Sequence, residues 1–141
     1  MTETRLQVVF DTADPHAQAR WWADALHYDV EDHTDVVEHL LGAGQLQSAE
    51  VMEIDGRRVF RDVAACRDPS GARPRLFFQR VPEPKTAKNR VHLDLQVGVE
   101  QAPAEVERLV SLGATVAWTI SDRGPLTTTL RDPEGNEFCI T

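Results

Sequence analysis

The sequence predicts an α+β protein in which two βαβββ modules form a curved mixed sheet, with a helical insertion in the first module. Three observations support this fold class. Several short segments alternate apolar and polar residues, as strands with one buried face do. Two segments carry apolar residues at helical spacing. The order strand, helix and three strands occurs in both halves, so the halves are predicted to be structural repeats.

The first half opens with a short strand followed by a helix. The apolar residues Leu6, Val8 and Phe10 alternate with their neighbours, which indicates the strand. Asp14 can accept hydrogen bonds from the first free amides of a helix, and Pro15 suits the first helical position. Since the apolar residues that follow recur at helical spacing, we expect this helix to cover the sheet.

The rest of the first half is predicted to contain a short strand, an insertion, an extended segment, a turn and another strand. In chain order these elements occupy residues 28–31, 35–56, 57–66, 68–71 and 75–81. Within the insertion, residues 36–41 are expected to form a helix ended by Gly42, and residues 48–53 a second short helix.

The second half begins with a strand predicted for residues 91–97. Its odd-numbered apolar residues alternate with His92, Asp94 and Gln96, so three hydrogen-bonding side chains share one face. We interpret that face as lining a cavity rather than facing water. A helix and three strands are expected after it, at residues 103–112, 115–121, 126–131 and 137–141.

The spacing of matching features tests the repeat. The helix ends at Leu26 and Leu112 are 86 residues apart, whereas the Asp-Pro turns at Asp68 and Asp132 are 64 apart. The difference of 22 equals the length of the insertion 35–56. We therefore expect one domain, residues 1–141. Its parts are module one with the insertion, a connector and module two, at residues 1–82, 83–90 and 91–141.

Composition narrows the classes of function. With 141 residues, a net charge of -8 and 41% hydrophobic residues, the chain is predicted to be globular, and its charge would repel nucleic acid. No apolar run approaches the length of a membrane helix, so no membrane partner is expected. Cys66 and Cys139 form no CxxC pair and no signal peptide is evident, which favours the cytoplasm.

Several motifs in a consistent order carry a family resemblance. They are Asp14-Pro15, Trp21-Trp22, Leu26-His27-Tyr28, Leu112-Gly113-Ala114 and Asp132-Pro133-Glu134-Gly135-Asn136-Glu137-Phe138. With the paired modules, they resemble the vicinal oxygen chelate superfamily. The connector running into residues 89–94 looks most like its glyoxalase-like and bleomycin-resistance group. The resemblance implies that each module curls into a trough, that two modules enclose a cavity, and that the protein is a homodimer.

The resemblance also points to four metal-ligand positions, on the first and last strands of the modules. They match Gln7, Gln79, His92 and Cys139. Metal-dependent relatives use His, Glu or Gln there, because a hard divalent cation needs nitrogen and carboxylate oxygen ligands. Two neutral amides, one imidazole and one thiol are a poor set of ligands for such a cation. We therefore expect no cofactor, with a divalent metal disfavoured although zinc at His92 and Cys139 remains open.

Without a metal, the polar face could still perform acid–base chemistry. His92 is the candidate base, with Asp94 or Glu137 setting its tautomer, so His92 and Glu137 are the candidate catalytic residues. The candidate ligand-binding residues are Gln7, Phe77, Gln79, Asp94 and Cys139. A simpler interpretation stays open, in which these polar groups satisfy one another inside a narrow trough.

Other side chains allow two interpretations each. Lys85, Lys88 and Arg90 could meet an anionic substrate or keep the connector solvated, and Trp118 could stack on a flat ligand or pack beneath a helix.

Three functions follow, and the leading hypothesis is a glyoxalase-like small-molecule-binding protein that could be a metal-independent lyase or isomerase acting on a carbonyl compound. The alternatives are a drug-sequestering protein of the bleomycin-resistance type, which the acidic balance favours, and a divalent-metal-dependent glyoxalase or dioxygenase.

Overall fold

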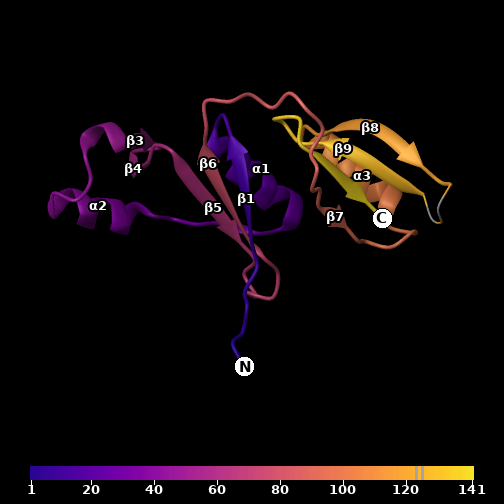
Figure 1. Cartoon of the computed structure of the whole chain (residues 1–141), viewed down its shortest axis with the longest axis horizontal. Helices are drawn as coiled ribbons and strands as arrows, with labels where there is room; N and C mark the ends of the chain where they lie inside the picture. Colours follow the sequence, from indigo (N-terminus) through magenta and orange to yellow (C-terminus); the bar gives the residue numbers. More distant parts are fainter. Residues whose placement is uncertain (123, 125) are drawn as a thin grey trace. The chain divides into compact units, whose positions relative to one another are not determined.

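The computed structural model describes residues 1–122, 124 and 126–141, and the chain divides into two compact units, Met1–Pro82 and Glu83–Thr141 (Figure 1). The first unit contains β1 Gln7–Thr12, α1 Pro15–Leu26, β2 Asp29–Val30, α2 Thr34–Gly42, the 3-10 helix η1 Ser48–Glu50, β3 Val51–Ile54, β4 Arg57–Phe60, β5 Val63–Arg67 and β6 Arg75–Arg80. The second contains β7 Asp94–Leu95, α3 Ala102–Ser111, β8 Thr115–Ile120, β9 Thr127–Arg131 and β10 Glu137–Ile140. The α+β fold class predicted from the sequence is confirmed.

The first unit is built on a sheet with the strand order β1-β6-β5-β2. β1 and β6 run parallel, and the other neighbours are antiparallel. α1 packs against β5 and β6, and its Trp22 is fully buried. The Trp22 ring lies 5.4 Å from that of Phe10, which stacks on Phe78 at 5.1 Å. These aromatic side chains form the core between the helix and one face of the sheet.

Both ends of α1 follow from local sequence. The Asp14 carboxylate accepts a hydrogen bond of 3.0 Å from the backbone N–H of Ala17, and Pro15 occupies the first turn. At the other end His27 adopts a left-handed conformation with φ 57°, and the Tyr28 N–H donates to the Ala23 carbonyl at 2.8 Å. The helix predicted from the Asp-Pro motif is thus confirmed.

The insertion is only partly helical. α2 forms as predicted, but the second helix expected at residues 48–53 is wrong, because η1 ends at Glu50 and β3 pairs antiparallel with β4. The β-branched residues of this hairpin suit a pleated pair better than a helix turn. Arg58 of β4 forms an ion pair with Glu38 of α2, which ties the hairpin to that helix.

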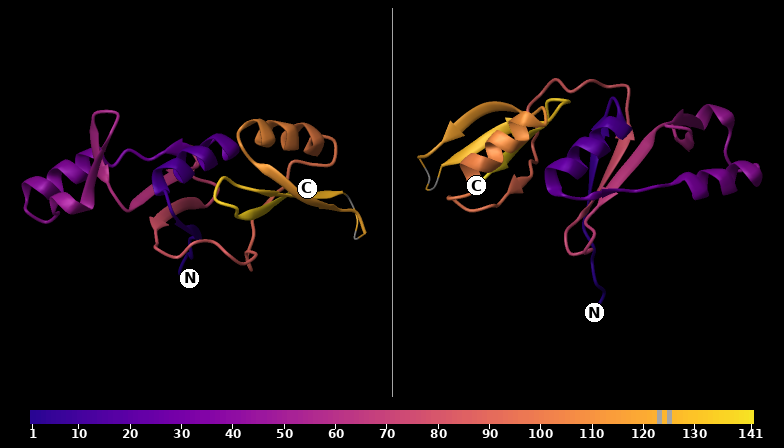
Figure 2. Two further views of the ribbon diagram at one scale, coloured as in Figure 1. Left: turned by 90° about the horizontal axis from the view of Figure 1, so that it is seen from above. Right: turned by 180° about the vertical axis from the view of Figure 1, so that it is seen from behind.

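The second unit has a sheet with the order β7-β10-β9-β8 and carries α3 on one face (Figure 2). β7 and β10 run parallel, and the remaining pairs are antiparallel. The core side chains Leu109, Leu130, Phe138 and Ile140 are buried. Each unit therefore repeats the arrangement of a parallel first and last strand, with a helix on the sheet, that the repeat predicts.

The strand expected at residues 91–97 is shorter than predicted. Only Asp94 and Leu95 pair with β10, and Val91 is 83% exposed. The backbone approaches β10 from Leu93 onward, where the Leu93 carbonyl accepts from the Cys139 N–H at 2.9 Å. His92 therefore lies just before the strand, in irregular backbone.

Both Asp-Pro turns are organised by a buried carboxylate. Asp68 accepts hydrogen bonds from the Ser70 hydroxyl at 2.8 Å and from the Arg73 N–H at 3.0 Å. Asp132 accepts from the N–H groups of Glu134 and Asn136, both at 2.9 Å. The turns predicted at these sites are confirmed, and each sets the last strand of its unit.

Among the helices of the described residues, none has the length and apolar character required to cross a membrane.

Acid should destabilise the first unit through two of its carboxylates. Hydrogen bonds from Arg75 lower the pKa of Glu31 below its ordinary value of 4.5, and hydrogen bonds from Arg73 lower that of Asp68 below 3.8. The unfolded chain binds these protons more readily, so this stabilisation is complete above about pH 5 and is lost as pH falls through the lowered values. We expect the urea midpoint to fall between pH 6 and pH 3, and to fall less steeply in Glu31→Gln. In the control variant Glu83→Gln, which changes an exposed position, the urea midpoint should fall with pH as it does in wild type. If the midpoint falls equally steeply with pH in all three proteins, Glu31 does not contribute to the acid sensitivity.

Candidate functional site

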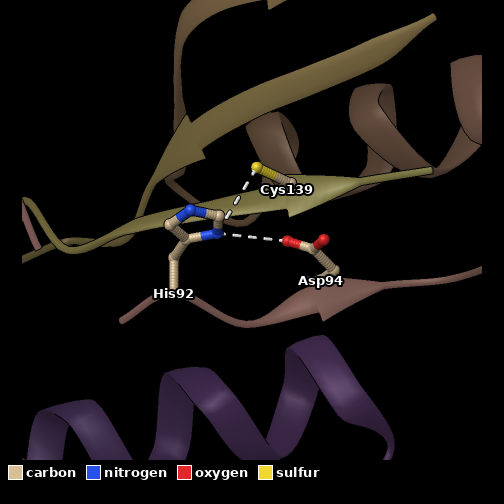
Figure 3. A group of neighbouring side chains, drawn as sticks. All are labelled: His92, Asp94 and Cys139. Atoms are coloured by element: carbon tan, nitrogen blue, oxygen red, sulfur yellow. Dashed lines mark hydrogen bonds and ion pairs between the residues drawn. The ribbon is translucent and has the colours of Figure 1, made fainter. Parts of the chain in front are cut away.

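Three side chains of the second unit converge at the junction of β7 and β10. His92 Nδ1 lies 3.2 Å from the Asp94 carboxylate and 4.0 Å from Cys139 Sγ (Figure 3). Cys139 is 7% exposed, whereas His92 and Asp94 lie at the surface. Two of the groups can therefore meet a ligand directly, with the thiol beneath them.

The parallel ladder explains why these residues meet. Asp94 is the register partner of Cys139, and Leu95 that of Ile140. Side chains alternate between the faces of a strand, so Cys139 points away from the face on which Ile140 enters the core. His92, two residues before Asp94, reaches the same side. Sequence alternation grouped His92 with Asp94, the family resemblance matched His92 and Cys139 to ligand positions, and the structure brings the three side chains together.

Cys139 is held as a neutral thiol. Burial raises the pKa of the Cys139 thiol, and the Asp94 carboxylate beside it raises this pKa further. The contact of 3.3 Å between Cys139 Sγ and the Thr129 hydroxyl acts in the opposite direction. The net direction is upward, so at neutral pH this residue is not an activated nucleophile.

The same three residues offer a set of metal donors. One nitrogen of His92, one oxygen of Asp94 and the sulfur of Cys139 lie within 4.8 Å of one another. Nitrogen, oxygen and sulfur ligands with an open fourth position suit Zn²⁺, and thiolate is a poor ligand for Mn²⁺ or Mg²⁺. The donors therefore fit a zinc ion, provided that Cys139 loses its proton on binding.

Glu137 has different partners from those expected. Its carboxylate lies 3.1 Å from Lys85 Nζ and accepts a hydrogen bond of 3.0 Å from the Asn89 N–H. Burial alone would raise the pKa of Glu137, but these two donors outweigh it and lower the pKa below its ordinary value. The structure thus places Asp94, and not Glu137, on the His92 ring. Glu137 fastens the connector to β10.

A pocket of about 380 Å³ lies along this connector. It is lined by Lys85, Thr86, Ala87, Lys88, Trp118, Arg131, Gly135 and Glu137. The strand registers connect it with the cluster, because Trp118 pairs with Thr129, Thr129 with Cys139, and Cys139 with Asp94. These four residues form one row across the sheet.

The candidate residues of the first unit do not converge. Gln7 accepts a hydrogen bond of 2.9 Å from Arg75, and Gln79 donates one of 2.8 Å to Asp11. Gln7 is paired in register with Arg75 and Gln79 with Asp11, so the two amides are four residues apart along the sheet, about 13 Å. Phe77 lies between them, beneath the Arg75 guanidinium at 5.3 Å. Gln7 and Gln79 therefore cannot share a ligand atom.

Sequence reasoning overlooked Thr129 and Arg131. Both lie on β9 and belong to the face that carries Cys139 and Glu137, their register partners on β10. The alternation of residues 127, 129 and 131, folded back across the Asp132 turn, was a signal that could have found them.

The fold, in which each unit has a parallel first and last strand and a helix on its sheet, is that of the vicinal oxygen chelate superfamily. The model of the glyoxalase-like domain family matches residues 7–141, so the chain belongs to this family. No curated protein matches the chain in sequence.

Solved structures share the fold at low sequence identity. The fosfomycin resistance protein FosX from Mesorhizobium loti is 12% identical with a TM-score of 0.64, covering 99% of this chain and 91% of its own. An enzyme of the glyoxalase/bleomycin resistance protein/dioxygenase family from Burkholderia phytofirmans PsJN is 14% identical, with a TM-score of 0.62. The match covers 95% of this chain and 94% of that enzyme. A mutant FosX from Listeria monocytogenes is 10% identical, with a TM-score of 0.60, and its structure is a complex with Mn(II) and 1S,2S-dihydroxypropylphosphonic acid. The match covers 99% of this chain and 90% of that protein. At these identities the likeness extends to the fold alone.

Proposed function

We propose that the protein binds a small carbonyl compound on the polar face of the second unit and acts on it as a metal-independent lyase or isomerase, with His92 as the base. The observation that carries this proposal is the contact of 3.2 Å between His92 Nδ1 and the Asp94 carboxylate. A carboxylate on one ring nitrogen fixes the tautomer and leaves the other nitrogen as the proton acceptor. No group of the described residues hydrogen-bonds His92 Nε2, so this nitrogen is available to a ligand.

The chemistry that this arrangement supports is proton transfer beside a carbonyl. Nε2 takes a proton from the carbon next to the carbonyl, the C–H electron pair forms a C=C bond, and the carbonyl π electrons move to oxygen. Asp94 stabilises the imidazolium that results. Return of the proton to a different carbon gives an isomerase, and departure of a group from the neighbouring carbon gives a lyase. No oxidant or reductant is required.

A zinc-dependent activity is the second candidate, and the donor geometry of His92, Asp94 and Cys139 favours it. A bound zinc ion would polarise the carbonyl of a ligand as a Lewis acid. In that case His92 is a ligand and cannot be the base, which separates the two candidates. Sequestration of cationic drugs is not proposed for this face, because Lys85, Lys88 and Arg131 line its pocket.

Proton exchange in D₂O tests the proposal. We expect wild-type protein to accelerate the loss of α-protons from hydroxyacetone or phenylpyruvate above the rate in buffer, measured by ¹H NMR, and to do so equally after EDTA treatment. Exchange that disappears with EDTA and returns with Zn²⁺ would select the zinc candidate instead. No exchange above buffer under either condition would overturn proton transfer as the function.

The proposal includes a cellular setting and an assembly. We infer a cytoplasmic homodimer that acts on a small molecule and has no nucleic-acid or membrane partner. In support, the net charge is -8, and both cysteines are free thiols buried in the fold. Burial raises the pKa of the Cys66 thiol to about 12, so this thiol is also unreactive at neutral pH. Two unpaired thiols are compatible with a reducing compartment such as the cytoplasm.

A further inference from the structure

Two cations flank one indole in the pocket along the connector. Lys88 Nζ lies 6.0 Å from the centroid of the Trp118 ring, and the Arg131 guanidinium lies 5.7 Å from it. Lys88 comes from the connector, whereas Trp118 and Arg131 come from β8 and β9. Two positive charges are thus brought to one aromatic surface by segments far apart in the sequence.

The hydrogen-bonding capacity of these cations is largely unused. Lys85 is committed, since its ammonium contacts Glu137 at 3.1 Å and donates to the Ala87 carbonyl. Within residues 1–122, 124 and 126–141, by contrast, Arg131 approaches Glu137 only at 3.9 Å, and Lys88 donates one long bond of 3.4 Å to the Asn89 carbonyl. A guanidinium has five donors and an ammonium three. The Glu137 carboxylate, 7% exposed, contacts two of the three cations that line this pocket, Lys85 and Arg131, so the three cations give the pocket a local excess of positive charge.

We propose that this pocket binds the anionic group of a flat, aromatic carboxylate, with the ring of the ligand on Trp118 and its carboxylate on Arg131 and Lys88. A planar guanidinium matches a carboxylate in two parallel hydrogen bonds, and Lys88 adds a second charge. The part of the indole that these two cations leave uncovered supplies an apolar surface for the ring of the ligand. The pocket of about 380 Å³ has room for a molecule of one or two rings.

The location connects this pocket with the proposed chemistry, on which the inference rests. One row of register partners crosses four neighbouring strands of the sheet, and its members are Trp118, Thr129, Cys139 and Asp94. Adjacent strands are about 4.8 Å apart, so Cys139 lies about 10 Å from Trp118 across the sheet. A ligand anchored at Trp118 can therefore extend its carbonyl toward His92. The substrate class is thus an aromatic compound that bears both a carboxylate and a carbonyl.

Equilibrium binding of 1-naphthoate, measured by calorimetry and by the indole ¹H–¹⁵N signal of Trp118, tests the pocket without any reaction. We expect binding that weakens when NaCl is raised from 0.1 to 1 M, because salt screens exposed charges. The neutral analogue 1-naphthamide should bind at least about tenfold more weakly, since it lacks the charge that Arg131 and Lys88 recognise. Arg131→Gln and Trp118→Leu should each weaken naphthoate binding about tenfold.

The matched control is Arg67→Gln, which removes an arginine charge from an exposed position in the other unit. Its affinity for naphthoate should equal that of wild type. If naphthoate does not bind, or binds no better than naphthamide, or if Arg67→Gln weakens binding as much as Arg131→Gln, the inferred pocket is wrong. Hydroxyacetone carries neither a ring nor a carboxylate, so its proton exchange does not depend on this pocket. If hydroxyacetone exchanges its α-protons but naphthoate does not bind, only the inferred pocket is wrong. If naphthoate binds but no α-proton exchange occurs, only the proposed proton transfer is wrong.

Discussion

Replacing His92 with glutamine should lower the rate of α-proton exchange by about 10²–10⁴-fold, which corresponds to about 3–5 kcal/mol of transition-state stabilisation. Glutamine retains a polar side chain of similar reach but accepts no proton at neutral pH. Because His92 lies in irregular backbone before β7 and is exposed, the fold should not depend on it. The rate is measured by ¹H NMR in D₂O, with hydroxyacetone as the carbonyl compound.

Asp94→Asn separates positioning from catalysis. The imidazole remains in this variant, but it loses the carboxylate 3.2 Å from Nδ1, so we expect a smaller fall of about 10–100-fold. Asp94→Glu should recover part of the rate, which a merely structural role for Asp94 would not explain. A His92→Gln protein that is folded by circular dichroism and exchanges α-protons at the wild-type rate would contradict the assignment of the base.

Zinc binding is the independent check on the same residues. If the metal-free chemistry holds, Zn²⁺ that binds His92, Asp94 and Cys139, as measured by calorimetry, should inhibit exchange because it occupies the base. If zinc activates exchange, His92 acts as a ligand.

The fold was predictable because its signals are local. The Asp14-Pro15 cap, the turns at Asp68 and Asp132 and the alternation of β1 each act over a few residues, and the structure confirms all of them. The hairpin of β3 and β4 was missed because residues 48–53 contain apolar side chains at spacings that suit either a short helix or a strand. Pairing with β4 decides between them, and that contact is not visible in either segment alone.

Alternation could predict the candidate site only where its residues follow one strand, whereas Cys139 was assigned to it from the family resemblance. His92 and Asp94 are two residues apart, so alternation grouped them. Glu137, by contrast, is 52 residues from Lys85 and 48 from Asn89, and the choice of these partners depends on how the connector folds back along β10. The position of Arg131 over Trp118 likewise requires the pairing of β8 with β9. Long-range contacts of this kind have no local signature.

The second large effect is expected in the core of the first unit. Trp22→Ala removes a fully buried indole whose ring lies 5.4 Å from Phe10 and 5.1 Å, edge to face, from Trp21. Loss of the buried surface and the cavity left behind should lower the free energy of unfolding by about 3–5 kcal/mol. Since native domains have only about 5–15 kcal/mol of stability, this variant is expected to be near the limit of folding.

Two further variants keep this prediction testable if Trp22→Ala does not fold. Trp22→Phe retains a ring against Phe10 and should cost about 1–2 kcal/mol, since less volume is lost. Val9→Ala, next to Phe10 on β1 but 50% exposed, should cost less than about 1 kcal/mol because the side chain does not enter this core. Urea unfolding followed by circular dichroism gives the three values. If Val9→Ala lowers the free energy of unfolding as much as Trp22→Phe does, the other face of the sheet is buried as deeply as the face that the helix covers. That result would be evidence for a covered inner surface, on which a ligand or a second copy of the chain packs.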